Sequence, residues 1–69
     1  MEFKLEGEEF ILLQSLLKAI GWCETGGDAK SVILEGYVTV DGIIETRRGK
    51  KMRSGQVVTF NNQQIKIIP

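Results

Sequence analysis

The chain has 69 residues, of which 42% are hydrophobic and 26% are charged, and its nine basic and nine acidic side chains leave a formal net charge of zero. This length predicts one domain, residues 1–69, with a small core and a globular rather than disordered chain. One cysteine and no histidine exclude an internal disulfide, a zinc site built from Cys and His, and a Ser-His or Cys-His catalytic pair.

The first part of the chain predicts a short strand and then a helix. Residues 2–5 alternate between polar and apolar side chains, which is typical of a strand. Between residues 8 and 20 the apolar side chains recur at intervals of three and four, which predicts an amphipathic helix. Glu8 and Glu9 suit the N-terminal end of that helix, and Gly21 suits its C-terminal end.

A second helix is predicted to begin at Thr25 and to end at Gly36. Thr25 is a typical N-cap residue, and Asp28 stands three positions later, in the place of the capping-box acid. Gly26 and Gly27 are poor helix formers, at roughly 1 kcal/mol each relative to alanine. Two glycines in a first turn therefore indicate either close packing of the two helices or close approach of a ligand to the backbone.

The rest of the chain is rich in β-forming residues. Residues 37–40 alternate, Asp41-Gly42 is a strong signal for a two-residue hairpin turn, and residues 43–46 return as the pairing strand. Further turn signals separate two more strand-like runs. The order is strand, helix, helix and about four short strands. We therefore predict an α+β fold, with two helices packed on a small, mostly antiparallel sheet of about four to five short strands.

Charge is distributed unevenly along the chain. Residues 1–45 carry nine acidic and three basic side chains, whereas residues 46–69 carry six basic and none acidic. The local field, and not the total charge, attracts an anion. Such asymmetry indicates contact with nucleic acid or a membrane surface.

Five of the seven residues in the basic segment, residues 47–53, are Arg or Lys. The segment is predicted to be a loop between two strands, and because no acidic residue follows Glu45, its cations are expected to be unpaired. A loop that is merely solvated is the alternative. We expect phosphate contacts, since arginine binds phosphate through a fork of donors and lysine through a point charge. The residues expected to make them are Arg47, Arg48, Lys50, Lys51 and Arg53.

Four other candidates for nucleic-acid contact lie outside this segment. Lys30 is on the polar face of the second predicted helix, where a lysine is usually only solvated. The amides of Gly26 and Gly27 can receive a phosphate at the helix N-terminus, although neighbouring acids oppose an anion there. Tyr37 can stack on an unpaired base, at roughly 1–3 kcal/mol, or pack in the core. For Trp22, core packing is favoured.

No motif indicates catalysis, a cofactor or a membrane span. The chain has no glycine-rich phosphate loop, so we expect no enzymatic activity, no cofactor and no bound metal. No apolar run approaches the ~20 residues of a membrane span, and the N-terminus is unlike a signal peptide. We therefore expect a cytoplasmic protein without a membrane partner. Cys23 suits a reducing compartment; a reactive thiol is the alternative, which the adjacent Glu24 disfavours.

Three motifs follow the first predicted helix between residues 13 and 58. They are Thr25-Gly26-Gly27-Asp28-Ala29-Lys30, Gly36-Tyr37-Val38-Thr39-Val40-Asp41-Gly42 and Gly55-Gln56-Val57-Val58. This stretch, about two-thirds of the chain, resembles the S-four-type RNA-binding domain, also called the αL RNA-binding motif. With the two glycines and the basic segment, the chain looks closest to the short, stand-alone bacterial proteins of this type. The resemblance implies an αL fold and RNA binding.

Three positions depart from the family pattern. Gly26 stands where the family usually has an RNA-contacting arginine, Tyr37 replaces a common histidine, and Gln56 replaces an aspartate. The loss of the arginine implies that affinity has moved to the basic segment, with Lys30 keeping the second basic position.

The resemblance and the charge pattern together imply a monomer that binds structured RNA. The candidate ligands are ribosomal RNA and transfer RNA, and the protein is one that could associate with the ribosome. Because phosphate contacts carry no sequence code and RNA helices are recognised largely by shape, we expect structural specificity. The alternative is a protein-interaction module whose basic segment binds an acidic partner, and a second alternative is weak binding to an anionic membrane surface.

Overall fold

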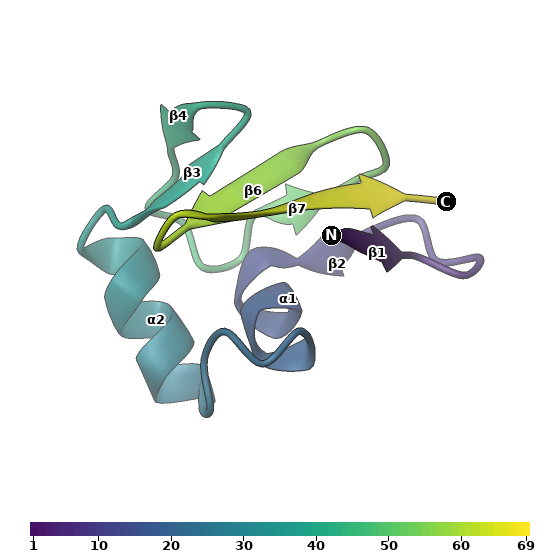
Figure 1. Cartoon of the computed structure of the whole chain (residues 1–69). Coiled ribbons are helices and arrows are strands. Elements are labelled where there is room, and N and C mark those ends of the chain that lie inside the picture. Colours follow the sequence, from purple (N-terminus) through teal and green to yellow (C-terminus); the bar gives the residue numbers. More distant parts are fainter.

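A computed structural model describes residues 1–69, which form two helices and seven strands in two sheets (Figure 1). The larger sheet has the strand order β1-β7-β6-β3-β4, and β2 pairs with β5 in the smaller one. All strand pairs are antiparallel except β1 with β7. The predicted α+β arrangement is confirmed. The elements are β1 (Glu2–Lys4), β2 (Ile11–Leu12), α1 (Leu13–Ala19), α2 (Gly26–Leu34), β3 (Val38–Val40), β4 (Ile43–Ile44), β5 (Lys51–Met52), β6 (Val57–Phe60) and β7 (Gln63–Ile68).

Helix α1 begins later than the apolar spacing predicts. It starts at Leu13, so the prediction of a helix from Glu8 is wrong, and Glu8 and Glu9 do not sit at its N-terminal end. Ile11–Leu12 instead form β2, which pairs with β5 and places Ile11 opposite the buried Met52. The backbone hydrogen bonds of that pairing compete with continuing the helix toward the N-terminus.

The predicted ends of α2 are confirmed. The side-chain oxygen of Thr25 accepts a hydrogen bond from the Asp28 amide at 3.1 Å, and Gly36, just past the helix, has a φ of +83°, which favours glycine. Helix packing does not explain the two glycines of the first turn. A Cβ on Gly26 meets nothing within 4 Å, and one on Gly27 meets only the Thr25 side chain, at 3.7 Å.

The hairpin between β3 and β4 forms as predicted, with shorter strands. Asp41 and Gly42 have φ values of +51° and +83°, as a two-residue turn of the favoured hairpin type requires. Thr39 pairs with Ile44 across the strands. The Asp41 carboxylate also accepts a hydrogen bond from the Val57 amide at 2.9 Å, which ties the turn to β6.

Thirteen buried apolar residues form the core between the helices and the main sheet. Trp22 packs against this core, with its ring 6.2 Å from that of Phe60, so the core interpretation of Trp22 is confirmed. Met52 is fully buried although it lies inside the basic segment, and it anchors that segment to the core. The core residues are Leu5, Leu13, Leu16, Leu17, Cys23, Ala29, Ile33, Val38, Val40, Met52, Val58, Ile65 and Ile67.

Candidate nucleic-acid interface

The basic segment is not a simple loop, because its second half contains a strand. Lys51–Met52 form β5, which pairs with β2. Successive side chains of a strand point to opposite faces, so Met52 enters the core while Lys51 is exposed. The prediction of a loop throughout residues 47–53 is therefore wrong for these two positions. The pairing fixes this half of the segment.

The first half of the segment is held by the N-terminus of α1. The Leu13 amide donates to the Lys50 carbonyl at 2.8 Å, and the Gln14 amide donates to the Arg48 carbonyl at 3.1 Å. Helix α1 has no side-chain N-cap, and the first amides of a helix lack partners within it. The carbonyls of the basic segment therefore take the place of a cap. They also fix the segment's backbone against the helix.

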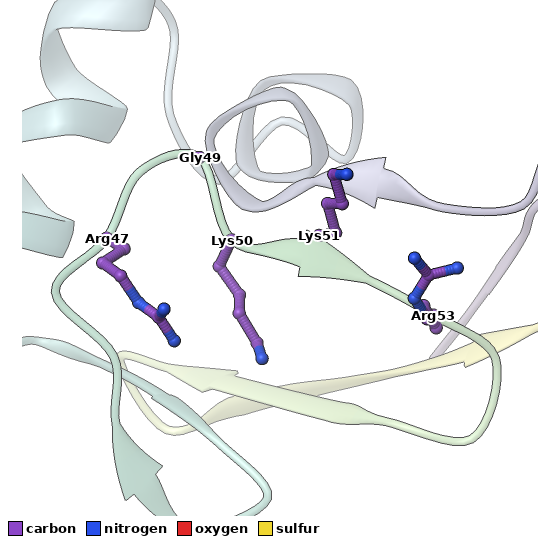
Figure 2. Close-up of a pocket in the computed structure, with 5 residues that line it drawn as sticks. All are labelled: Arg47, Gly49, Lys50, Lys51 and Arg53. Carbon is purple, nitrogen blue, oxygen red and sulfur yellow. The ribbon is translucent and has the colours of Figure 1, made fainter.

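Four cationic side chains and Gly49 line a hollow of about 490 Å³, the basic hollow, and no apolar or acidic residue lines it. Figure 2 shows Arg47 and Lys50 pointing to one side of the segment, and Lys51 and Arg53 to the other. Four of the five predicted cations therefore line one hollow, as two pairs on either side of the segment. The fifth, Arg48, is exposed and is not part of the lining.

Arg47 is paired, contrary to prediction. Its Nε lies 3.1 Å from Oε2 of Glu45 and its Nη2 lies 3.3 Å from Oε1, while its backbone amide also donates to Oε2 at 3.0 Å. The side-chain hydrogen bond and then the backbone one lower the pKa of Glu45. The Arg47 side chain stays 74% exposed. A guanidinium has five N–H donors, so donors remain available for a phosphate.

Phe10 is a site residue that the sequence analysis missed. The Lys51 Nζ lies 5.0 Å from the centre of the Phe10 ring, and the Arg53 guanidinium carbon lies 5.5 Å from it. Each distance falls within the range of a cation–π interaction, worth about 0.5–1 kcal/mol at an exposed site. The ring therefore restrains two cations of the basic hollow. The sequence assigned Phe10 to a helix stripe, and nothing in its local pattern links it to the basic segment.

The other predicted site residues lie outside the basic hollow. Lys30, Gly26 and Gly27 are exposed on α2, and none of them lines the hollow. Tyr37 is 61% exposed between α2 and β3, so the core-packing alternative is wrong for this residue. Contact of these four residues with RNA stays a prediction.

Three other features bear on metal binding, membrane insertion and thiol chemistry. No group of three or more His, Cys, Asp and Glu side chains is placed to hold a metal ion, and neither helix has the length and apolar character needed to cross a membrane. Cys23 is free and buried. Burial and then the charge of Asp28 raise the pKa of its thiol. The raised pKa disfavours a reactive thiolate. The acid that contributes to it is Asp28, whereas the sequence pointed to Glu24.

The comparisons with known proteins agree with this fold. The family model described as S4 domain matches residues 3–68, and the chain belongs to this family. The YbcJ proteins of Escherichia coli (strain K12) and Shigella flexneri are each 41% identical to it over 66 residues, which is 96% of this chain and 94% of each relative. The family resemblance inferred from the motifs is confirmed.

A solved structure gives the same answer for the fold. The solution structure of YbcJ from E. coli, which reveals an αL motif involved in RNA binding, superposes with a TM-score of 0.75 at 40% identity. The match covers 99% of this chain and 86% of that one. The fold is therefore the αL fold that the three motifs imply.

Proposed function

We propose that this protein binds structured RNA and that the basic segment makes the main contacts with phosphates. The observation that carries the proposal is the basic hollow, whose lining holds four cations and no acidic or apolar side chain. Such a lining attracts phosphate, and it offers a base no apolar surface on which to stack. The likeness to YbcJ, whose αL motif is involved in RNA binding, supports the same function.

The rigidity of the segment supports phosphate binding as well. Ordering a flexible loop costs free energy on association. Here the β2–β5 pairing and the two amides of α1 already hold the backbone, and Phe10 restrains two of the side chains. Three of the five cations are therefore held before RNA arrives, since Glu45 restrains Arg47 in the same way.

The mode of binding follows from these contacts. Phosphate contacts position a protein without reading sequence, and RNA helices are recognised largely by shape. We infer that a monomer of this domain recognises the shape of a ribosomal or transfer RNA element in a reducing cytoplasm. It acts by binding alone, since the chain has no histidine and its single thiol is buried.

A charge-matched pair of variants tests the proposal. Lys50→Ala with Lys51→Ala removes two charges from the basic hollow, whereas Lys18→Ala with Lys66→Ala removes two exposed charges elsewhere. Binding of a labelled RNA hairpin is measured for both at one salt concentration. We expect a large loss of affinity for the first pair and a small one for the second. Equal losses of affinity for the two double variants would show that only the net charge of the protein matters and would contradict a defined RNA site at the basic hollow.

A further inference from the structure

A second, smaller hollow lies beside the basic one. It has a volume of about 220 Å³ and lies between the β3–β4 hairpin and the basic segment. Lys50 lines both hollows, so they adjoin at this side chain. We call the second one the hairpin groove. Its lining consists of Val40, Asp41, Ile43, Ile44, Glu45, Lys50 and Gln56.

The apolar part of the hairpin groove is formed by Val40 of β3 and the two residues of β4. Ile43 is 74% exposed and Ile44 is 62% exposed, and their strand is at an edge of the main sheet. Single exposed apolar residues are ordinary on a protein surface. Ile43 pairs with the buried Val40 across β3 and β4, so these two side chains share a face of the sheet, whereas Ile44 points to the other face. An exposed isoleucine beside a buried valine, in a groove that also holds a cation, is a more specific arrangement. An apolar surface next to a positive charge is what an unpaired nucleotide needs, since its base is apolar on both faces and its phosphate is an anion.

The groove also carries polar groups that the protein itself does not use. The Gln56 side-chain oxygen accepts a hydrogen bond from the Arg53 amide at 2.7 Å, which leaves the two N–H donors of its Nε2 free. Asp41 uses Oδ1 to accept from Val57, which leaves Oδ2 free. One donor group and one acceptor thus lie in the lining. Recognition of unpaired RNA bases depends on hydrogen bonds of this kind to the base edges.

We propose that the hairpin groove takes the base of one unpaired nucleotide, while the phosphate of that nucleotide lies against Lys50. This inference rests on the proposed RNA binding and adds a preference for unpaired nucleotides to it. The volume is below the roughly 300–1,000 Å³ of pockets for drug-sized ligands, and it suits a single planar base. The groove also holds the carboxylates of Asp41 and Glu45, of which Glu45 is paired with Arg47. Lys50 lies where the groove meets the basic hollow, whose lining has four cations and no acid, and this side of the groove favours RNA over a protein segment as the occupant.

Two RNA hairpins with the same stem test this proposal, one fully paired and one with a single bulged nucleotide. The variant is Ile43→Thr with Ile44→Thr, since threonine is β-branched and keeps strand propensity. The control is Leu34→Gln, which removes an apolar side chain that is 54% exposed and outside the groove. A thermal melt of each variant checks the fold.

The parent protein and the control should bind the bulged hairpin with about fivefold to tenfold higher affinity than the paired one. This lies near the low end of base-stacking energies, because isoleucine has no π face. The double variant should lose this preference and keep its affinity for the paired hairpin. Equal binding of both hairpins by the parent, or an unchanged preference in the variant, overturns the groove and leaves the proposed function standing. A parent that binds neither hairpin overturns both.

Discussion

The ion pair between Glu45 and Arg47 sets the net charge that the basic segment presents to RNA. The segment has five cations, and the paired carboxylate cancels one of them, which leaves four. Each neutralised phosphate adds roughly −0.7 to −0.9 to the slope of log affinity against log salt. We therefore expect a slope of about −2.8 to −3.6, which is a loss of roughly 50- to 150-fold between 50 and 200 mM salt.

Glu45→Gln makes this reasoning testable, because it removes the negative charge while its amide oxygen can still accept a hydrogen bond from Arg47. The slope should become steeper by roughly 0.7 to 0.9, and binding at low salt should tighten. Arg47→Ala should shift the slope by a similar amount in the opposite direction. Fluorescence anisotropy of a labelled RNA hairpin, titrated at five or six salt concentrations, gives the three slopes.

The lowered pKa of Glu45 defines the pH range of the experiment. The ordinary value is 4.5 and the hydrogen bonds from Arg47 lower it. The stabilising contribution of the pair is therefore fully present above the unfolded pKa, and it is lost as pH falls through the lower folded value. The slope of the parent should not change between pH 6 and 8. Identical slopes for the parent and Glu45→Gln would refute the claim that this carboxylate reduces the charge available to RNA.

Three further predictions concern stability and reactivity. Thr25→Ala should lower the free energy of unfolding by about 0.5–2 kcal/mol through loss of the cap, whereas Thr46→Ala, at an exposed position, should not; equal denaturant midpoints would contradict the cap. Gly42→Ala should lower the free energy of unfolding by roughly 1–2 kcal/mol because the backbone there is left-handed. Gly49 has open space around it and no positive φ, so Gly49→Ala should lower the free energy of unfolding much less in the same melts. Cys23 should react with iodoacetamide at pH 8 far more slowly in the folded protein than in urea. Equal alkylation rates of the folded and urea-unfolded protein would show that the thiolate is accessible. The raised pKa of Cys23 also means that the free energy of unfolding falls as pH rises above 9.0, because only the unfolded chain then ionises the thiol.

The features that could be predicted from the sequence are set by a few neighbouring residues. Thr25 caps α2 through a hydrogen bond three residues along the chain, and Asp41-Gly42 turns the hairpin through the backbone conformations of two residues. Gly36 ends α2 in the same local manner. Local chemistry of this kind depends little on the rest of the fold, so the short motif is enough to predict the helix end or the turn.

The features that the sequence did not reveal depend on distant parts of the chain. Ile11–Leu12 become a strand because β5, about forty residues later, pairs with them. Apolar spacing alone fits a helix from Glu8 just as well. Strand β1 was predicted from its alternation, but its parallel pairing with β7 joins the two ends of the chain. No local pattern contains that information.

The candidate site shows the same division. The run of cations was visible in the sequence, and so was the signal for the ion pair, since Glu45 and Arg47 are two positions apart and can face the same side of an extended chain. The role of Phe10 could not be foreseen, because it depends on the β2–β5 pairing. The hairpin groove depends on the approach of Lys50 to β4, which only the folded chain shows.

The central claim, that the basic segment is the main RNA contact, is tested most directly by locating the crosslinked peptide. The protein is crosslinked to RNA by ultraviolet light in cells, and it is then cut by a protease that cleaves after glutamate. The positions of the glutamates yield peptides 10–24, 25–35, 36–45 and 46–69. These separate the start of α2, the hairpin and the basic segment from one another.

Mass spectrometry then shows which peptide carries the nucleotide. We predict that RNA is attached mainly to peptide 46–69, which contains the whole basic segment, and that the hairpin groove adds a weaker signal on peptide 36–45. RNA attached to peptide 25–35 alone would place the contact at Gly26, Gly27 and Lys30 and would contradict the account.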